Sequence, residues 1–196
     1  MGTRLTKSLL SLGFLTVVEH EAHGLLGGYL LVNATGRPLE FHCTAPIKPN
    51  RAQQILYGPT LEPYLYGEQI GKTLVATAKT KPMVVCTDLL PAMAVEEHIN
   101  LPVLLVDSLA PGDELQRPAD TAQESGRISR VDAPHGGGPP LAWFRFRGCR
   151  VAVSIRSGSN REVIQSRLEC TSEVFDVAEP FERIRSAIEE AQRGSS

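Results

Sequence analysis

Hydrophobic and polar residues alternate along the first part of the chain, as they do in strands that bury one face. Three such runs follow one another, separated by a polar group at 20–23 and by the turn sequence Asn-Ala-Thr-Gly at 33–36. The predicted strands cover residues 14–19, 24–33 and 37–44, after a short helix over residues 3–12. The pattern predicts an antiparallel meander in the N-terminal part of the chain.

The third run leads into the stretch with the densest collection of reactive side chains, Leu39 to Gly58. His42 and Cys43 are neighbours on the predicted strand, so they should point to opposite faces. Two prolines then end the strand, because proline has no backbone N–H to donate. Asn50, followed three residues later by Gln53, has the pattern of a capping box and predicts a short helix.

A helix is then predicted over residues 61–79, followed by a buried strand at 82–86, a helix at 89–99 and a second apolar strand at 101–106. A parallel return requires a crossover of a dozen or so residues, so this strand-helix-strand unit predicts a parallel pair. Asp88 follows the first strand, at the edge where α/β sheets bind ligands. Capping of the next helix is its alternative role.

Residues 109–140 are rich in proline and glycine and poor in apolar residues, which predicts a disordered insert or a lid. Strand patterns return over residues 141–169, with a hairpin turn at 157–160 and a last strand at 163–168. A helix over 161–168 is the competing interpretation, because so few residues do not define a period. Pro180 opens a final amphipathic helix.

Together these elements predict one α/β (or α+β) domain over residues 1–196. Its mixed sheet is expected to combine an N-terminal antiparallel meander, a parallel β-α-β unit and a C-terminal meander with a closing helix.

Composition narrows the class of protein. The 196 residues are 42% hydrophobic with a formal net charge of −2, which argues against a nucleic-acid partner and is compatible with self-association. No apolar run reaches the roughly 20 residues that a membrane span needs. The four cysteines form no CxxC motif and no signal-peptide cleavage site is evident, so a cytoplasmic protein with reduced thiols is expected.

A metal site, with zinc as the expected ion, is one hypothesis for the N-terminal region. His20 and His23 lie three residues apart, and Cys43 on the returning strand would add a ligand. Cys86 joins this set if the cysteines at predicted strand ends converge. A solvated polar turn and cysteines packed in the core are the alternative explanations.

The 42–51 region also suggests binding or catalysis. Lys48, Asn50 and Arg51 surround the start of the short helix, where free N–H groups bind anions, so a small anionic ligand is expected there together with Asp88. Cys43 is the nucleophile candidate. His42 is beside it in sequence but should point to the other face, so His20 or His23 would have to be the base. The alternative is a capped helix whose two cations lie in water.

A basic stretch gives a third hypothesis. Between Arg127 and Arg167 there are eight arginines and only two acids. Arg145 and Arg147 would share a strand face beside Trp143, which is typical of an RNA or phosphate platform. Acidic residues follow closely, so a structural salt-bridge surface is the preferred interpretation.

The sequence EFHCTAPIKPNRAQQILYGPTLEPYLYGEQIGKTL resembles a family of uncharacterised bacterial proteins associated with planctomycetes, over roughly residues 14–107. The resemblance implies no activity. The phosphate-binding GxxxxGK[ST], the dinucleotide-binding GxGxxG and the GxSxG nucleophile motif are absent.

Three functions follow. The leading one is a small binding or regulatory module, with a protein or a small anionic ligand as partner, because no complete catalytic set can be assembled. The alternative is a cysteine- or metal-dependent enzyme acting on a small anionic substrate at the 42–51 strand-turn-helix. The second alternative is an RNA-binding protein.

Overall fold

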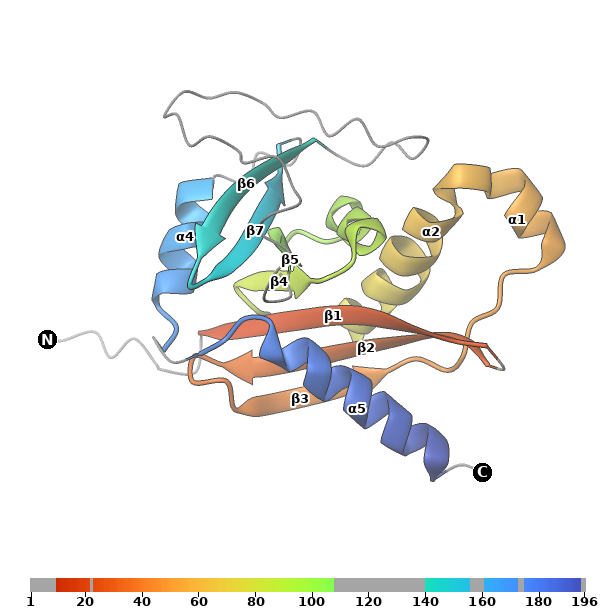
Figure 1. Ribbon diagram of the computed structural model, residues 1–196, viewed down its shortest axis with the longest axis horizontal. Helices are drawn as coiled ribbons and strands as arrows, with labels where there is room; N and C mark the ends of the chain where they lie inside the picture. Colours follow the sequence, from red (N-terminus) through yellow and green to blue (C-terminus); the bar gives the residue numbers. More distant parts are fainter. Residues whose placement is uncertain (1–9, 22, 108–139, 156–160, 173–174, 195–196) are drawn as a thin grey trace, which may run out of the picture.

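The computed structural model describes residues 10–21, 23–107, 140–155, 161–172 and 175–194. They form a seven-stranded sheet in the order β3-β2-β1-β4-β5-β7-β6 (Figure 1). The strands are β1 (Ser11–His20), β2 (Gly24–Asn33), β3 (Pro38–Cys43), β4 (Val84–Thr87), β5 (Val103–Asp107), β6 (Leu141–Phe146) and β7 (Cys149–Ser154). Strands β1, β4 and β5 run parallel, and the outer pairs are antiparallel. The predicted mixed α/β sheet is therefore confirmed.

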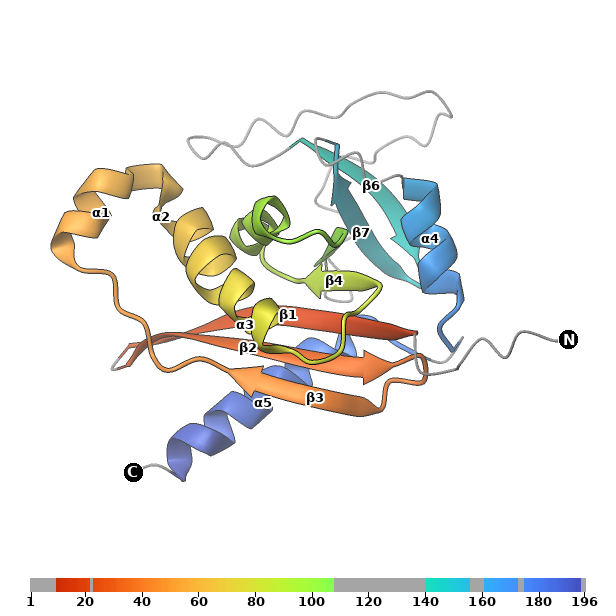
Figure 2. The same ribbon diagram turned by 180° about the vertical axis from the view of Figure 1, so that it is seen from behind.

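Helical segments cover both faces of this sheet. They are α1 (Arg51–Tyr57), the 3-10 turn η1 (Gly58–Thr60), α2 (Leu61–Pro63), the π-helix η2 (Tyr64–Lys72), α3 (Thr73–Thr77), the 3-10 helix η3 (Leu90–His98), α4 (Arg161–Glu169) and α5 (Glu179–Arg193). The segments from α2 to α3 follow one another without a break, as the predicted helix over 61–79 required. Helix α5 crosses β1 to β3 on one face, and η2 and α3 lie on the other (Figure 2).

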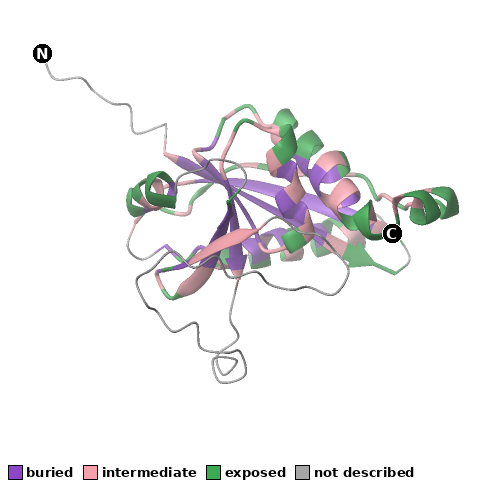
Figure 3. Ribbon diagram, turned by 90° about the horizontal axis from the view of Figure 1, so that it is seen from above, coloured by how far each residue is buried: buried purple, intermediate pink, exposed green. Residues whose placement is uncertain are grey.

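The central strands of the sheet are buried (Figure 3). Their alternate residues build two cores, one on each face. On β1, Leu12 and Phe14 pack beneath α4 and α5, whereas Leu15 and Val17 pack beneath η2 and η3. Such alternation is what a period of two requires when both faces are covered. The two faces of the sheet therefore have different chemical surroundings, which decides where each candidate residue lies.

Two predicted elements differ in the structure. The helix over 3–12 is wrong at residues 11 and 12, which begin β1, and residues 3–9 lie outside the described part. Gly13, expected to end that helix, lies inside β1, where the ring of Tyr29 crosses the strand and would meet any Cβ. The strand predicted at 163–168 is also wrong. Ile164 and Leu168, four residues apart, are both buried, and this is the spacing of the helix that forms there.

The predicted insert at 109–140 and the turn at 157–160 lie outside the described residues, except for Pro140. Within the described ranges, the helices are too short or too polar to cross a membrane.

Candidate ligand-binding site

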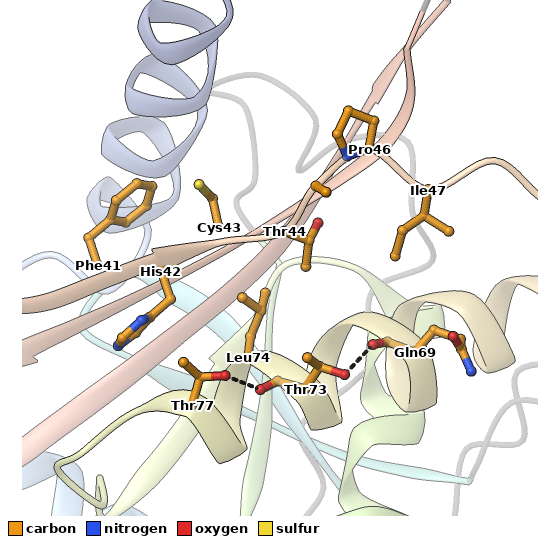
Figure 4. A pocket seen from close by; sticks show the side chains of 11 residues that line it. Phe41, His42, Cys43, Thr44, Pro46, Ile47, Gln69, Thr73, Leu74 and Thr77 are labelled. Carbon is orange, nitrogen blue, oxygen red and sulfur yellow. Dashed lines mark hydrogen bonds between the residues drawn. The ribbon is translucent and has the colours of Figure 1, made fainter.

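A surface pocket of about 580 Å³ lies where the edge strand β3 meets the helical segment η2–α3 (Figure 4). The lining residues are Phe41, His42, Cys43, Thr44, Ala45, Pro46, Ile47, Gln69, Thr73, Leu74 and Thr77. This volume is within the range of small-molecule sites, roughly 300–1,000 Å³. The ionisable groups among these lining residues are the His42 imidazole and the Cys43 thiol.

The strand side of the pocket is fixed by a hydrogen bond within β3. Glu40 Oε2 lies 3.1 Å from His42 Nε2, and both side chains are largely buried. The carboxylate also accepts the backbone N–H groups of Lys79 and Thr80, each at 2.9 Å. A hydrogen bond from the Thr80 side chain, then those from the Lys79 amide and from His42, lower the pKa of Glu40 to about 2. Glu40 is thus a permanent acceptor.

The state of His42 follows from that contact. A carboxylate accepts hydrogen bonds only, so Nε2 of His42 carries the proton that the pair shares. In the neutral imidazole, Nδ1 then remains as an acceptor. Glu40 therefore holds both the ring orientation and the tautomer of the histidine that lines the pocket.

The helical side presents a row of polar residues four positions apart. Thr73 Oγ1 donates to the carbonyl of Gln69 at 2.7 Å, and Thr77 Oγ1 donates to the carbonyl of Thr73 at 2.8 Å (Figure 4). Each hydroxyl proton is committed to the helix, so each oxygen is left with lone pairs only. The amide of Gln69 donates to the Tyr64 hydroxyl at 2.9 Å, which leaves its carbonyl oxygen available.

Hydrogen-bond acceptors therefore outnumber donors on the pocket side chains. Thr44 and Gln69 are the exceptions. Thr44 Oγ1 accepts the N–H of Gly27 at 2.9 Å and its own proton stays available, and the Gln69 amide keeps a second N–H. The arrangement suits a ligand that brings N–H or O–H donors. It is poorly suited to an anion, since no lysine or arginine is among the residues that line the pocket.

Cys43 does not form a nucleophile–base pair with His42. In the β2–β3 register His42 is opposite Tyr29, which packs beneath η2, whereas Cys43 is opposite Gly28, which faces Ile184 of α5. The opposite orientation expected of the two side chains is confirmed (Figure 4). A catalytic pair of Cys43 and His42 therefore lacks the required geometry.

None of the residues proposed for anion binding lines the pocket. The capping box is confirmed, because Asn50 Oδ1 accepts the N–H of Gln53 at 2.8 Å while the Gln53 side chain accepts that of Asn50 at 3.0 Å. The backbone N–H of Asn50 is thus already hydrogen-bonded to Gln53. Lys48 packs its side chain against Gly24, and Arg51 is exposed on α1.

Asp88 follows the carboxyl end of β4, as predicted, but its side chain does not cap η3. The amide of Leu89, which begins the turn of η3, donates to Thr87 Oγ1 instead, at 3.3 Å. The carboxylate of Asp88 forms an ion pair with Arg185 of α5, and its buried Oδ1 has no hydrogen-bond partner among the described residues. Asp88 therefore does not cap a helix; its ion pair with Arg185 connects the end of β4 to α5.

The four predicted metal ligands do not come together. His20 and His23 are adjacent, with ring centroids 4.6 Å apart, and line a smaller pocket of about 260 Å³ against α5. The strand register places Cys43 four residues away along the sheet and two strands across, roughly 13 Å and roughly 10 Å. Cys86 is fully buried, and burial raises its pKa to about 12. Among the described residues, no group of three metal-binding side chains is found.

The arginines of the basic stretch have individual structural roles. Arg147 lies in the β6–β7 turn, beyond the strand face predicted for it, with φ of 47°. Its guanidinium donates to Thr171 and Ser172. Arg150 stacks on Trp143 at 4.2 Å. Arg147 and Arg150 thus contact neighbouring groups of the protein itself.

Sequence reasoning missed the helical half of the pocket. Gln69, Thr73 and Thr77 were not selected, although their spacing of four places them on one side of a helix. Glu40 was missed as well, although it lies two residues from His42 and so on the same strand face.

No family model and no curated protein matches this chain. A search of solved structures finds Ciona intestinalis endonuclease V in complex with a 23mer DNA containing an inosine, at 15% identity and a TM-score of 0.33. The match covers 54% of this chain and 50% of that one, so the chain spans about half the length of the structure it resembles. A likeness of this degree supports no inference about activity.

Proposed function

We propose that this protein is a non-catalytic binding module whose ligand is a small, uncharged or cationic molecule rich in hydrogen-bond donors. The pocket between β3 and η2–α3 is its binding site. The observation that carries this proposal is the set of acceptor oxygens on Thr73, Thr77 and Gln69, which line the same pocket as His42. The hydroxyl protons of both threonines are already donated to helix carbonyls.

We propose a binding module and not an enzyme, because the candidate nucleophile, Cys43, has no histidine in position to act as its base. Cys43 is exposed on the face of the sheet opposite His42, and His20 is two strands away. General base catalysis needs the base within hydrogen-bond reach of the group it activates. The small anionic ligand predicted from Lys48 and Arg51 gives way to a donor-bearing one, because the hollow lies beside the acceptors and not beside the cations.

All four cysteines are free, which supports the further proposal of a reducing, cytoplasmic location.

Thermal unfolding in the presence of two ligand panels tests the binding proposal. One panel carries donors, such as primary amines, amides and nucleobases, and the other carries anions, such as phosphate, sulfate and citrate. A ligand that binds the folded state raises the melting temperature by mass action. We expect at least one member of the donor panel to raise it, and none of the anions.

A matched pair of variants then locates the binding. Thr73→Leu fills the pocket and removes an acceptor, so it should abolish the shift. Thr60→Leu, whose hydroxyl also donates to a helix carbonyl but lies outside the pocket, should keep it. A shift given by the anions alone, or one that survives in Thr73→Leu, would overturn the proposal.

A further inference from the structure

A negative charge lies behind the histidine that lines the β3 pocket. Glu40 stays ionised at neutral pH, because hydrogen bonds, first of all from the Thr80 side chain, hold its pKa at about 2. The groups that donate to it are backbone amides, a hydroxyl and the neutral His42 ring, so they satisfy its lone pairs without cancelling its charge. Among the described residues that line the pocket, none is a lysine or an arginine. A bound molecule therefore meets a negative potential at this wall.

The acceptors of the pocket match the hydrogen-bonding pattern of a primary ammonium group. Thr73 and Thr77 have donated their hydroxyl protons to helix carbonyls and keep lone pairs on Oγ1. His42 keeps Nδ1 as an acceptor, because its Nε2 proton is shared with Glu40. A primary ammonium carries three N–H donors and no acceptor, whereas a neutral amide would bring a carbonyl oxygen in among these acceptors.

Other organic cations suit this lining less well. A guanidinium ion is matched by paired carboxylate oxygens, and the Glu40 carboxylate does not line the pocket. A quaternary ammonium has no N–H and is held against aromatic faces. Phe41 lines the pocket, but its ring points away from His42 and Thr77 (Figure 4). The cation that fits is one recognised through its N–H groups.

We propose that the ligand of the β3 pocket is an aliphatic primary amine, bound as its ammonium ion by His42, Thr73 and Thr77. Its carbon chain would lie on the aliphatic part of the lining, which includes Ile47 and Leu74. Glu40 is a positioning residue, which acts through His42 by holding Nδ1 as an acceptor and by supplying the charge behind it. This inference rests on the binding function proposed above and narrows its ligand to one chemical class.

The position of Glu40 sets the size of the expected effect. A nitrogen bonded to Nδ1 of His42 is separated from the carboxylate by one imidazole ring and two hydrogen bonds, roughly 8 Å. In a partly exposed site, whose dielectric constant lies between those of protein and water, one charge at this distance changes affinity about fivefold.

NMR titrations of the labelled protein with three probes test the ligand class at neutral pH. Pentylamine carries charge and N–H donors, pentan-1-ol carries one donor and no charge, and pentyltrimethylammonium carries charge without a donor. Amide shifts of residues 69–77 give each dissociation constant. We expect pentylamine to bind about fivefold more tightly than either of the others. Raising the salt concentration should weaken pentylamine and leave pentan-1-ol unchanged, because salt screens the charge of Glu40.

A substitution that removes only the charge tests the role of Glu40. Glu40→Gln keeps the size of the side chain and a carbonyl acceptor, so it should weaken pentylamine about fivefold and leave pentan-1-ol unchanged. A purely structural role would weaken both probes equally. Glu62→Gln, at an exposed position outside the pocket, is the matched control and should leave both affinities unchanged.

The outcomes separate this inference from the function on which it rests. Three results would overturn the amine assignment and keep the binding function. They are pentan-1-ol binding as tightly as pentylamine, pentyltrimethylammonium binding as tightly as pentylamine, and an equal loss of both affinities in Glu40→Gln. Failure of all three probes and of the whole donor panel to bind would overturn the binding function and this inference together.

Discussion

Single residues in this protein often hold another residue in place. Glu40 orients His42 and also accepts the amides of Lys79 and Thr80, which join α3 to β4. Cys86, by contrast, lies in the hydrophobic core and acts as a small hydrophobic side chain. These two roles lead to predictions that can be checked on the intact chain.

Replacing Glu40 should change how stability depends on pH. The folded-state pKa is about 2, below the ordinary value of 4.5, so the carboxylate stabilises the fold above about pH 4.5 and loses that contribution as the pH falls towards 2. Glu40→Gln should lower the free energy of unfolding by about 1 kcal/mol at pH 7. In urea titrations the deficit should shrink between about pH 4.5 and 2, and the exposed control Glu62→Gln should show neither effect. A deficit independent of pH would contradict this role.

The four thiols should react with an aromatic disulfide reagent at three different rates. Cys43 and Cys170 are exposed and should react first, and Cys149 is half-buried, with its pKa raised by burial and then by Asp176, so it should react slowly. Cys86 should react only when the protein unfolds, because burial excludes the reagent and raises its pKa to about 12. Rapid labelling of all four thiols in the native protein would contradict the core position of Cys86.

At the scale of elements, hydrogen bonds from side chains tie the outer parts to the central sheet. Arg147 in the β6–β7 turn donates to Thr171 and Ser172, and Ser172 in turn donates to the carbonyl of Ala34 beside β2, at 2.8 Å. Asp88 and Arg185 join β4 to α5 in a similar way. The C-terminal helices therefore depend on contacts that are distant in sequence.

Removing the Arg147 side chain should loosen this connection. Arg147→Ala loses the three hydrogen bonds and keeps a Cβ at φ of 47°, so it should cost about 2 kcal/mol of unfolding free energy. Arg147→Gly loses the same bonds but tolerates the left-handed backbone, so its cost should be smaller. Arg145→Ala, at an exposed position of β6, should cost least. Equal losses for all three variants would show that Arg147 has no special role.

Local pattern was enough to predict most elements. The alternation of residues 14–44 predicted β1 to β3, and the strand-helix-strand spacing predicted the parallel pair β4 and β5. The error at 163–168 arose because α4 buries only Ile164 and Leu168, and two apolar positions do not define a period.

At the scale of the whole molecule, the candidate site could be predicted only in part. Its strand half, around His42 and Cys43, was found because reactive residues cluster there in the sequence. Its helical half joins residues 69–77 to that strand, and this contact is set by packing of Ile70 and Leu74 against β2. The separation of the predicted metal ligands could not be predicted for the same reason. The register that places Cys43 far from His20 is a property of the assembled sheet.

The central claim is that the β3 pocket binds a donor-bearing ligand without changing it. The most direct measurement is an NMR titration of the labelled protein with the best stabiliser from the donor panel, in which protein amides and ligand signals are followed together. We predict shifts confined to β3, residues 44–47 and residues 69–77, with ligand signals that stay unchanged over days. Shifts centred on residues 48–51 or on Asp88 and Arg185, or conversion of the ligand to a product, would contradict the claim.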